Sequence, residues 1–108
     1  MMVADPYTYR IGWSAEDAEF IGTCVEFPSL SWLDEDEDAA FRGIRKLVRE
    51  TVADMTAAGE AVPQPISLRP FSGKFQVRTT PEIHRRLTIE AAEAQVSLNR
   101  LVNSKLLG

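Results

Sequence analysis

The segment Lys74-Phe75-Gln76-Val77-Arg78-Thr79 decides how the last third of this chain folds. Apolar and polar side chains alternate along it, with Phe75, Val77 and Thr79 on one face and Lys74, Gln76 and Arg78 on the other. A period of two predicts a half-buried strand. The outward face holds three long donors, and Arg and Gln pair bidentately with guanine and adenine edges. We interpret the segment as a DNA-reading strand; the alternative is an ordinary solvated strand face.

Two helices are predicted after this strand. Thr80 suits the N-cap and Pro81 the first helical position, so a helix of about 14 residues begins there. Its apolar residues recur every three or four positions at Ile83, Leu87, Ala91 and Ala94. Ser97 is a second N-cap, and a second apolar face follows at Leu98, Leu101, Val102 and Leu106. The predicted unit is a strand, a helix, a turn and a helix.

This unit is too small to fold alone. Residues 73–108 number 36, which is below the roughly 40 residues that an unaided domain usually needs. A single strand also leaves both of its edges unpaired. We therefore expect two copies to pair their strands antiparallel about a two-fold axis, giving a homodimer or a higher even-numbered oligomer.

The segment resembles a ribbon-helix-helix domain, the class of β-ribbon DNA readers that includes the Arc and MetJ repressors. The resemblance implies that the outward residues Lys74, Gln76 and Arg78 contact bases of operator DNA. It also implies that the start of the second helix holds a phosphate with the backbone of Ser97, Leu98 and Asn99. Arg85 and Arg86 are either solvated helix charges or further phosphate contacts. His84, the only histidine, is expected at the surface and near phosphate at most.

The charge distribution separates two parts of the chain. Residues 1–72 hold six basic and thirteen acidic residues, whereas residues 73–108 hold six basic and three acidic ones. The net charges are therefore −7 and +3, and the basic part contains the DNA motif. One cysteine, Cys24, excludes a disulfide framework and suits a reducing cytoplasm. Met1–Pro6 lacks a signal-peptide pattern and no long apolar run exists, so we expect a cytoplasmic location and no membrane partner.

The N-terminal part is predicted to be a small α/β unit. Residues 7–13 alternate as a strand, residues 19–27 form a second strand stopped by Pro28, and residues 29–33 supply a third. A long helix is expected from the acidic run Asp34–Asp38 to Ala58, with Gly59 as its cap. Ile66–Leu68 is expected to add a fourth strand. Cys24, Trp13 and Phe27 are expected to lie in the core, although an exposed aromatic residue could anchor a partner.

The predicted fold class is α+β: an antiparallel sheet with one long helix (β-β-β-α-β), joined to a ribbon-helix-helix that dimerises. The predicted domains are 1–68 and 74–108, with a linker at 69–73. This arrangement resembles the HicB family of antitoxins along nearly the whole chain. The matching pieces include Phe27-Pro28, Gly59-Glu60 with Pro63 and Pro65, Ser72–Phe75 and Ser97–Val102.

The resemblance implies a cytoplasmic antitoxin. The single histidine and the single cysteine leave no ligand set for a metal ion, and we expect no cofactor. Residues 1–68 would bind and neutralise a HicA-like mRNA-cleaving toxin, and the C-terminal domain would repress the operon. The acidic charge suits a basic RNA-gripping partner. Asp34–Asp38 either complements the helix dipole or contacts the toxin.

Two other classes of protein remain. The first is a solo ribbon-helix-helix regulator with a ligand-sensing or oligomerising N-terminal domain. The second is a metal-dependent nuclease using carboxylates such as Glu26 and Asp34. We disfavour the nuclease because most acidic residues cluster at one helix start and few could converge. No Gly-rich phosphate loop or nucleophile motif is present, and we expect no enzymatic activity.

Overall fold

The structure is a computed structural model and describes residues 5–108. It divides into an N-terminal unit that ends at Phe71 and a C-terminal unit, Ser72–Gly108. Residues 1–4, which belong to the stretch where no signal-peptide pattern was found, lie outside the described residues. Between residues 5 and 108, no helix has the length and apolar character needed to cross a membrane.

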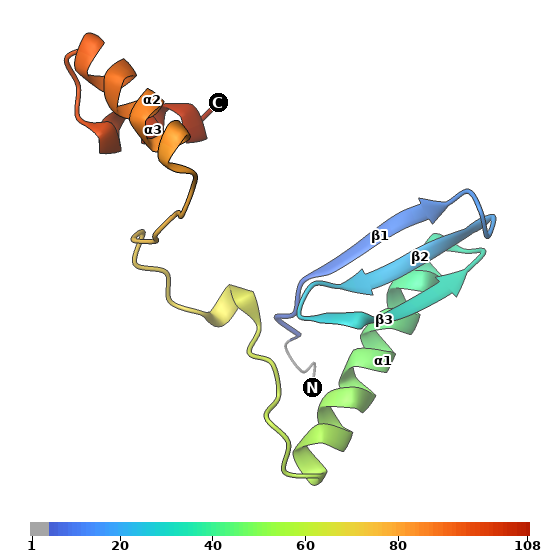
Figure 1. Cartoon of the computed structure of the whole chain (residues 1–108). Coiled ribbons are helices and arrows are strands. Elements are labelled where there is room, and N and C mark those ends of the chain that lie inside the picture. Colours follow the sequence, from blue (N-terminus) through green and yellow to red (C-terminus); the bar gives the residue numbers. More distant parts are fainter. Residues whose placement is uncertain (1–4) are drawn as a thin grey trace. The chain divides into compact units, whose positions relative to one another are not determined.

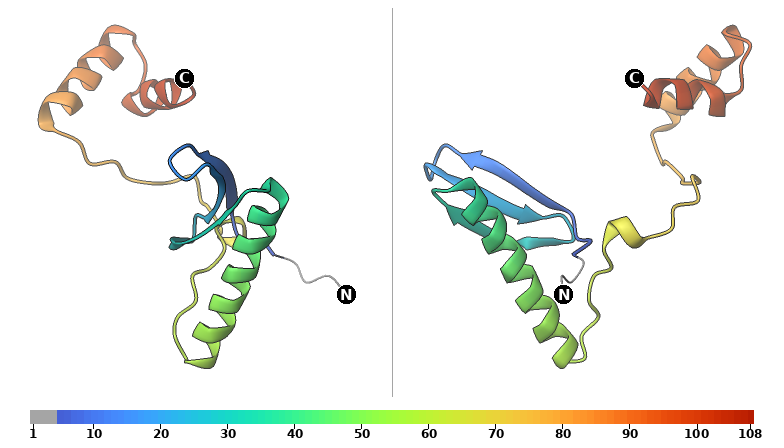
Figure 2. Two further views of the ribbon diagram at one scale, coloured as in Figure 1. Left: turned by 90° about the vertical axis from the view of Figure 1, so that its right-hand side faces the viewer. Right: turned by 180° about the vertical axis from the view of Figure 1, so that it is seen from behind.

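The N-terminal unit is a three-stranded antiparallel meander covered on one face by a helix. Its strands are β1 (Tyr9–Ser14), β2 (Glu19–Cys24) and β3 (Phe27–Asp34), in the order β1-β2-β3, and the helix is α1 (Glu37–Ala57). Figures 1 and 2 show α1 lying along one side of the sheet. The predicted α+β class, the three strands and the long helix are confirmed.

The turn between β2 and β3 corrects one detail of the sequence interpretation. Cys24 pairs with Phe27, so only Val25 and Glu26 separate the two strands. Pro28 therefore does not stop the second strand but lies within β3. The register shifts at this point, because Thr23 already pairs with Ser31. Proline is tolerated here since β3 is an edge strand with an irregularity, where no ladder donor is required.

Both ends of α1 are fixed by local hydrogen bonds. The helix begins at Glu37, three residues later than predicted, because the Asp36 carboxylate caps it by accepting the N–H of Ala39 at 2.9 Å. At the other end, Gly59 adopts φ +72°, and the N–H of Glu60 donates to the Met55 carbonyl at 2.9 Å. This is a Schellman cap, as predicted for Gly59.

The core lies between α1 and the strands β2 and β3. Its buried residues are Cys24, Phe27, Ile44 and Val48. Two glycines allow the close approach of the helix: Gly22 faces Ala40 and Ile44, and Gly43 lies directly against the Trp32 ring. The core positions predicted for Cys24 and Phe27 are confirmed. The prediction for Trp13 is wrong, because 58% of this residue is exposed.

Residues 62–68 form no fourth strand. Ile66–Leu68 is instead a short 3₁₀ helix, η1, in which the N–H of Leu68 donates to the Pro65 carbonyl at 3.0 Å. The segment is held against the start of β1 and the β2–β3 turn. The Tyr7 hydroxyl donates to the Pro63 carbonyl at 2.7 Å, and the Ser67 hydroxyl donates to the Pro6 carbonyl at 2.6 Å. Side-chain bonds replace the strand ladder that the sequence interpretation expected.

Glu26 is the central acceptor of this attachment. Its carboxylate accepts the N–H of Ile66 at 2.9 Å and both the N–H and the hydroxyl of Thr8 at 3.0 and 3.1 Å. Burial pushes the pKa of Glu26 upward, but the hydrogen bonds from Ile66 and Thr8 outweigh it and hold the pKa below its ordinary value. The ionised carboxylate thus joins three separate stretches of the chain.

Replacing Glu26 with glutamine is expected to destabilise the N-terminal unit by about 1 to 3 kcal/mol at pH 7. The amide nitrogen of glutamine is a donor, so it cannot accept the hydrogen bonds that Thr8 and Ile66 donate to the carboxylate. Since the folded-state pKa is lowered, the wild-type advantage is present above the ordinary value of 4.5 and disappears as pH falls through the folded pKa. Urea unfolding at pH 7 and at pH well below 4.5 measures both effects. Glu60→Gln, at an exposed position, is the control; equal midpoints for the two variants at pH 7 would contradict the assigned role.

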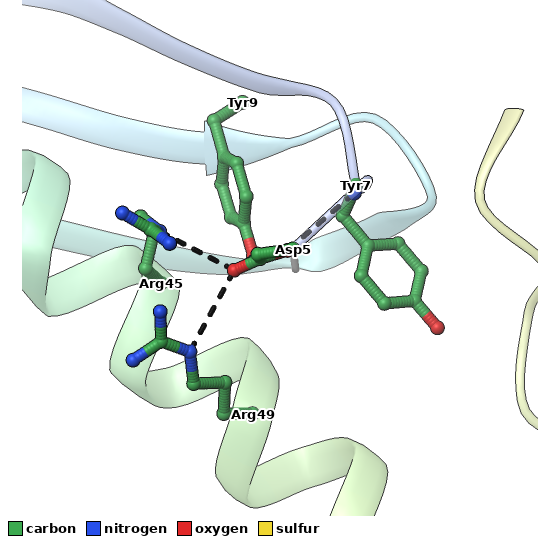
Figure 3. Close-up of polar contacts among 5 residues, drawn as sticks. All are labelled: Asp5, Tyr7, Tyr9, Arg45 and Arg49. Atoms are coloured by element: carbon green, nitrogen blue, oxygen red, sulfur yellow. Dashed lines mark hydrogen bonds and ion pairs between the residues drawn. The ribbon is translucent and has the colours of Figure 1, made fainter. Parts of the chain in front are cut away.

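A polar cluster ties the start of β1 to α1 (Figure 3). The Asp5 side chain is only 7% exposed and lies 3.3 Å from Nε of Arg45 and 3.7 Å from Nε of Arg49. The Tyr9 hydroxyl donates to the same carboxylate at 2.8 Å. Burial, and then this hydrogen bond, raise the pKa of Tyr9 well above its ordinary value. Sequence reasoning missed this cluster because Asp5 and Arg45 are 40 positions apart.

The C-terminal unit consists of two short helices after an extended segment. Helix α2 spans Pro81–Glu93 and α3 spans Leu98–Leu106. The predicted caps are confirmed, since Thr80 accepts the N–H of Ile83 at 3.2 Å and Ser97 accepts the N–H of Arg100 at 3.0 Å. Between the helices, Gln95 takes φ +57°. The predicted strand at 74–79 is not formed in the single chain, because a strand requires a partner for its ladder.

Candidate nucleic-acid interface

The segment 74–79 is extended and exposed along its whole length. It follows a turn in which Gly73 takes φ +81° and the Ser72 hydroxyl accepts the N–H of Lys74 at 3.0 Å. Its apolar side chains do not enter a core: Phe75 is 75% exposed and Val77 is 68% exposed. The segment therefore carries both an unused apolar face and the three predicted base-contacting residues.

The segment and the two helices enclose an open groove of about 1200 Å³. Lys74, Phe75, Val77 and Arg78 line it from the segment, Leu87 lines it from α2, and Leu98, Val102 and Leu106 line it from α3. Most of these side chains are apolar, and the cationic ones lie at the segment. The groove brings Lys74 and Arg78 together with Leu98 and Asn99, but Gln76 does not line it.

The start of α3 has the geometry expected of an anion site. Ser97 uses its side chain to cap the N–H of Arg100, and the first intrahelical bond runs from the N–H of Leu101 to the Ser97 carbonyl. The N–H groups of Leu98 and Asn99 lie in the first turn, where an α-helix provides no carbonyl partner. Together with the positive end of the helix dipole, such groups favour a phosphate.

Arg85 lies outside this groove. It borders a smaller hollow formed by α2 with Pro81 and Ile89, and its guanidinium lies 3.1 Å from the Glu82 carboxylate. The ion pair is exposed, so it stabilises α2 by no more than a few tenths of a kcal/mol. A phosphate contact by Arg85 stays a prediction.

Two residues of the groove received little weight in the sequence interpretation. His84 of α2 and Asn103 of α3 both line it. The Asn103 amide donates to the Asn99 carbonyl at 2.9 Å, which places the two asparagines on one side of α3. Their spacing of four residues was the available signal, because side chains at i and i+4 share a helix face.

The carboxylates considered for a metal site do not converge. Glu26 follows the end of β2, whereas Asp34 ends β3 at the opposite end of the sheet. Asp34 accepts the N–H of Asp36 at 3.0 Å, and Asp36 caps α1. Within residues 5–108, no group of three or more His, Cys, Asp or Glu side chains is arranged to hold a metal ion.

The exposed segment, the capped helix pair and the apolar groove define a small helical module whose apolar side chains are not buried within one chain. The HicB family model matches residues 57–106 of this chain, and the match supports membership of the HicB family. No curated protein and no solved structure matches the chain.

The match begins at the end of α1 and reaches the end of α3. It therefore covers most of the C-terminal unit and the segment that closes the N-terminal unit, and it leaves the three-stranded sheet outside. The match spans 50 of the 108 residues, just under half of the chain.

Proposed function

We propose that this chain is the antitoxin of a type II toxin–antitoxin system with two binding activities. Its N-terminal unit binds and neutralises a HicA-like mRNA-cleaving toxin. Its C-terminal unit dimerises as a ribbon-helix-helix, binds operator DNA and represses the operon that encodes it. The match to the HicB family over residues 57–106 supports the antitoxin assignment.

The DNA-binding part of the proposal is supported mainly by the lack of a core in the C-terminal unit. Between Ser72 and Gly108, Ala91 is the only buried residue. The large apolar side chains there remain more than 40% exposed at Phe75, Val77, Ile83, Ile89, Leu106 and Leu107. So much apolar surface on 37 residues favours association with another chain, since burying it is the main source of stability.

A second copy of the same unit is the partner that we propose, because it would cover the apolar groove and pair with the extended segment 74–79. Two antiparallel 74–79 segments would supply each other's ladder hydrogen bonds and turn Phe75 and Val77 toward the helices. The opposite face of this ribbon would then carry two copies each of Lys74, Gln76 and Arg78. A two-stranded ribbon of this kind fits the major groove of DNA. The two α3 starts would lie where they can hold the flanking phosphates.

The toxin-binding part of the proposal is supported by the acidic charge of the N-terminal unit. Residues 1–72 have a net charge of −7, and a toxin that grips RNA requires a basic surface. Opposite charges accelerate the encounter of the two proteins and disfavour acidic competitors.

A second candidate is a solo ribbon-helix-helix regulator whose N-terminal unit senses a ligand or oligomerises. The limits of the family match favour this alternative, because the three-stranded sheet lies outside it. Co-purification of the tagged full chain from its native cells, with and without nuclease treatment, separates the two functions. A small basic protein retained after nuclease treatment supports the antitoxin. Recovery of DNA alone would replace it with the solo regulator.

Arg78→Ala is expected to reduce discrimination between operator and scrambled DNA by about 1 to 3 kcal/mol, the size of one bidentate base contact. Lys74→Ala is the matched control, and it is expected to weaken binding to both duplexes more evenly. Affinity of the wild type should fall steeply with salt, because neutralising phosphates releases counterions. Fluorescence anisotropy on both duplexes at several salt concentrations measures these effects. Uniform weakening by both variants would remove Arg78 from base recognition.

A further inference from the structure

The β1 border of the N-terminal unit carries aromatic side chains that pack on one another but remain partly exposed. Trp13 is the penultimate residue of β1 and lies on its helix-facing side, and its ring packs edge to face on Phe20 with centroids 5.0 Å apart. Phe41 of α1 packs on Tyr9 of β1 in the same way at 5.9 Å, so it lies along the same border. Trp13 is 58% exposed and Phe41 is 38% exposed. We call Trp13, Phe20 and Phe41 the aromatic border.

The border is uncovered because of how α1 sits on the sheet. The helix is drawn toward β2 and β3, where Gly22 and Gly43 remove side chains and let Ala40 and the Trp32 ring approach closely. It therefore packs against β3 more extensively than against β1. The inner side of β1 is left open at Trp13. A large aromatic residue that points toward the core side and yet remains mostly exposed is a typical anchor for a partner.

The carboxylates around Trp13 favour a partner with a basic surface. Glu16 and Asp17 lie in the turn that follows β1, and Glu19 pairs with Ser14 across the hairpin. The register of β2 with β3 places Asp34 beside Phe20, and the acidic start of α1 follows directly. In the part of the chain that the structure describes, none of these carboxylates forms an ion pair.

Three of the unit's six basic residues form ion pairs away from Trp13: Arg45 and Arg49 are paired with Asp5 near the start of β1, and Lys46 faces Glu50 further along α1. The Arg45 guanidinium also lies 5.4 Å from the centre of the Phe41 ring. Arg10 lies within β1 and Arg42 follows Phe41, and neither forms an ion pair among the described residues. The β1–β2 turn beside Trp13, residues 15–18, carries two carboxylates and no lysine or arginine, so negative charge predominates there. A cationic side chain would gain both from the carboxylates and from the face of the indole ring.

We propose that the aromatic border, with Trp13 as its most exposed residue, is the surface that docks the basic RNA-binding face of the toxin. This inference rests on the proposed antitoxin function and adds the location of the contact. Trp13 would bury its ring against the toxin, and the carboxylates of the β1–β2 turn would face the toxin's lysines and arginines. The toxin's RNA site would be blocked because the same cations bind RNA phosphates.

The test measures binding of the full chain to an inactive variant of the HicA-like toxin by isothermal titration calorimetry. Trp13→Ser is expected to weaken toxin binding roughly 30-fold, as for a central aromatic anchor. Phe71→Ser is the matched control, since Phe71 is 70% exposed in the same unit but lies outside the border. A second pair compares Glu16→Lys with Glu60→Lys, of which only the former adjoins Trp13. Both border variants are expected to retain operator binding and the wild-type circular dichroism spectrum.

The possible results separate the two claims. Loss of toxin binding by Trp13→Ser and Glu16→Lys, with both controls unchanged, supports the docking surface. Wild-type affinity in both border variants would overturn the docking surface and leave the antitoxin function standing. If the wild-type chain itself does not bind the toxin, the antitoxin function fails and the docking surface fails with it.

Discussion

Phe75→Ser is expected to convert the C-terminal unit from a dimer into a monomer and to abolish operator binding. Phe75 is 75% exposed in the single chain, and the proposed ribbon would bury it between two helix pairs. Removing a buried phenylalanine costs about 3 to 5 kcal/mol, and a two-fold dimer loses this contribution twice. Few small dimers survive such a loss, because their total stability is of similar size.

Sedimentation equilibrium gives the assembly state of this variant, and anisotropy with operator DNA gives its binding. Phe71→Ser is again the control, because Phe71 is a similarly exposed phenylalanine that precedes the segment. It should remain dimeric and bind DNA normally. A Phe75→Ser chain that still dimerises and binds operator DNA would exclude strand pairing through residues 74–79.

Gly22→Val is expected to destabilise the N-terminal unit by about 3 kcal/mol or more, the upper end for overpacking a core. A Cβ atom at Gly22 would lie 2.8 Å from the Ala40 carbonyl oxygen and 2.8 Å from Cγ2 of Ile44. The carbonyl belongs to the helix backbone, so relief requires α1 to move away from the sheet. The cost therefore exceeds the gain in strand propensity that valine brings.

Gly12→Val is a matched control for this substitution. Gly12 lies on the neighbouring strand β1, and a Cβ atom there would have Cγ2 of Ile21 as its nearest contact at 4.0 Å. Urea unfolding monitored by tryptophan fluorescence compares both variants with the wild type. Equal unfolding midpoints for Gly22→Val and Gly12→Val would contradict the close approach of α1 to β2.

The parts of the fold that were predictable from sequence depend on local interactions. Strand alternation in residues 7–13, the caps Thr80 and Ser97, and the left-handed Gly59 each depend on neighbours within a few positions. Ile66–Leu68 was predicted wrongly because Glu26, 40 positions away, holds the backbone of Ile66. Trp13 was wrongly predicted to lie in the core. Periodicity assigns a side chain to one face of the sheet, but it does not say how much of that face the helix covers.

The candidate DNA site was predictable in a different sense. Alternation and side-chain type single out Lys74, Gln76 and Arg78, but the role that we propose for them depends on a second chain. In the single chain Lys74 and Arg78 line the same groove as Leu98 and Asn99, and their contact with DNA stays a prediction. A strand that forms only between two molecules is absent from one molecule, since its hydrogen-bond partners are intermolecular.

The burial of Cys24 has a practical consequence for studying the two units separately. It is the only cysteine in the chain, it is 2% exposed, and burial raises the pKa of its thiol. The thiolate is the reactive form, so a thiol reagent must wait until the N-terminal unit opens. The rate of labelling therefore reports the opening free energy of that unit alone, even while the C-terminal unit is bound to DNA. Toxin binding would slow the labelling by the amount that it stabilises the closed unit.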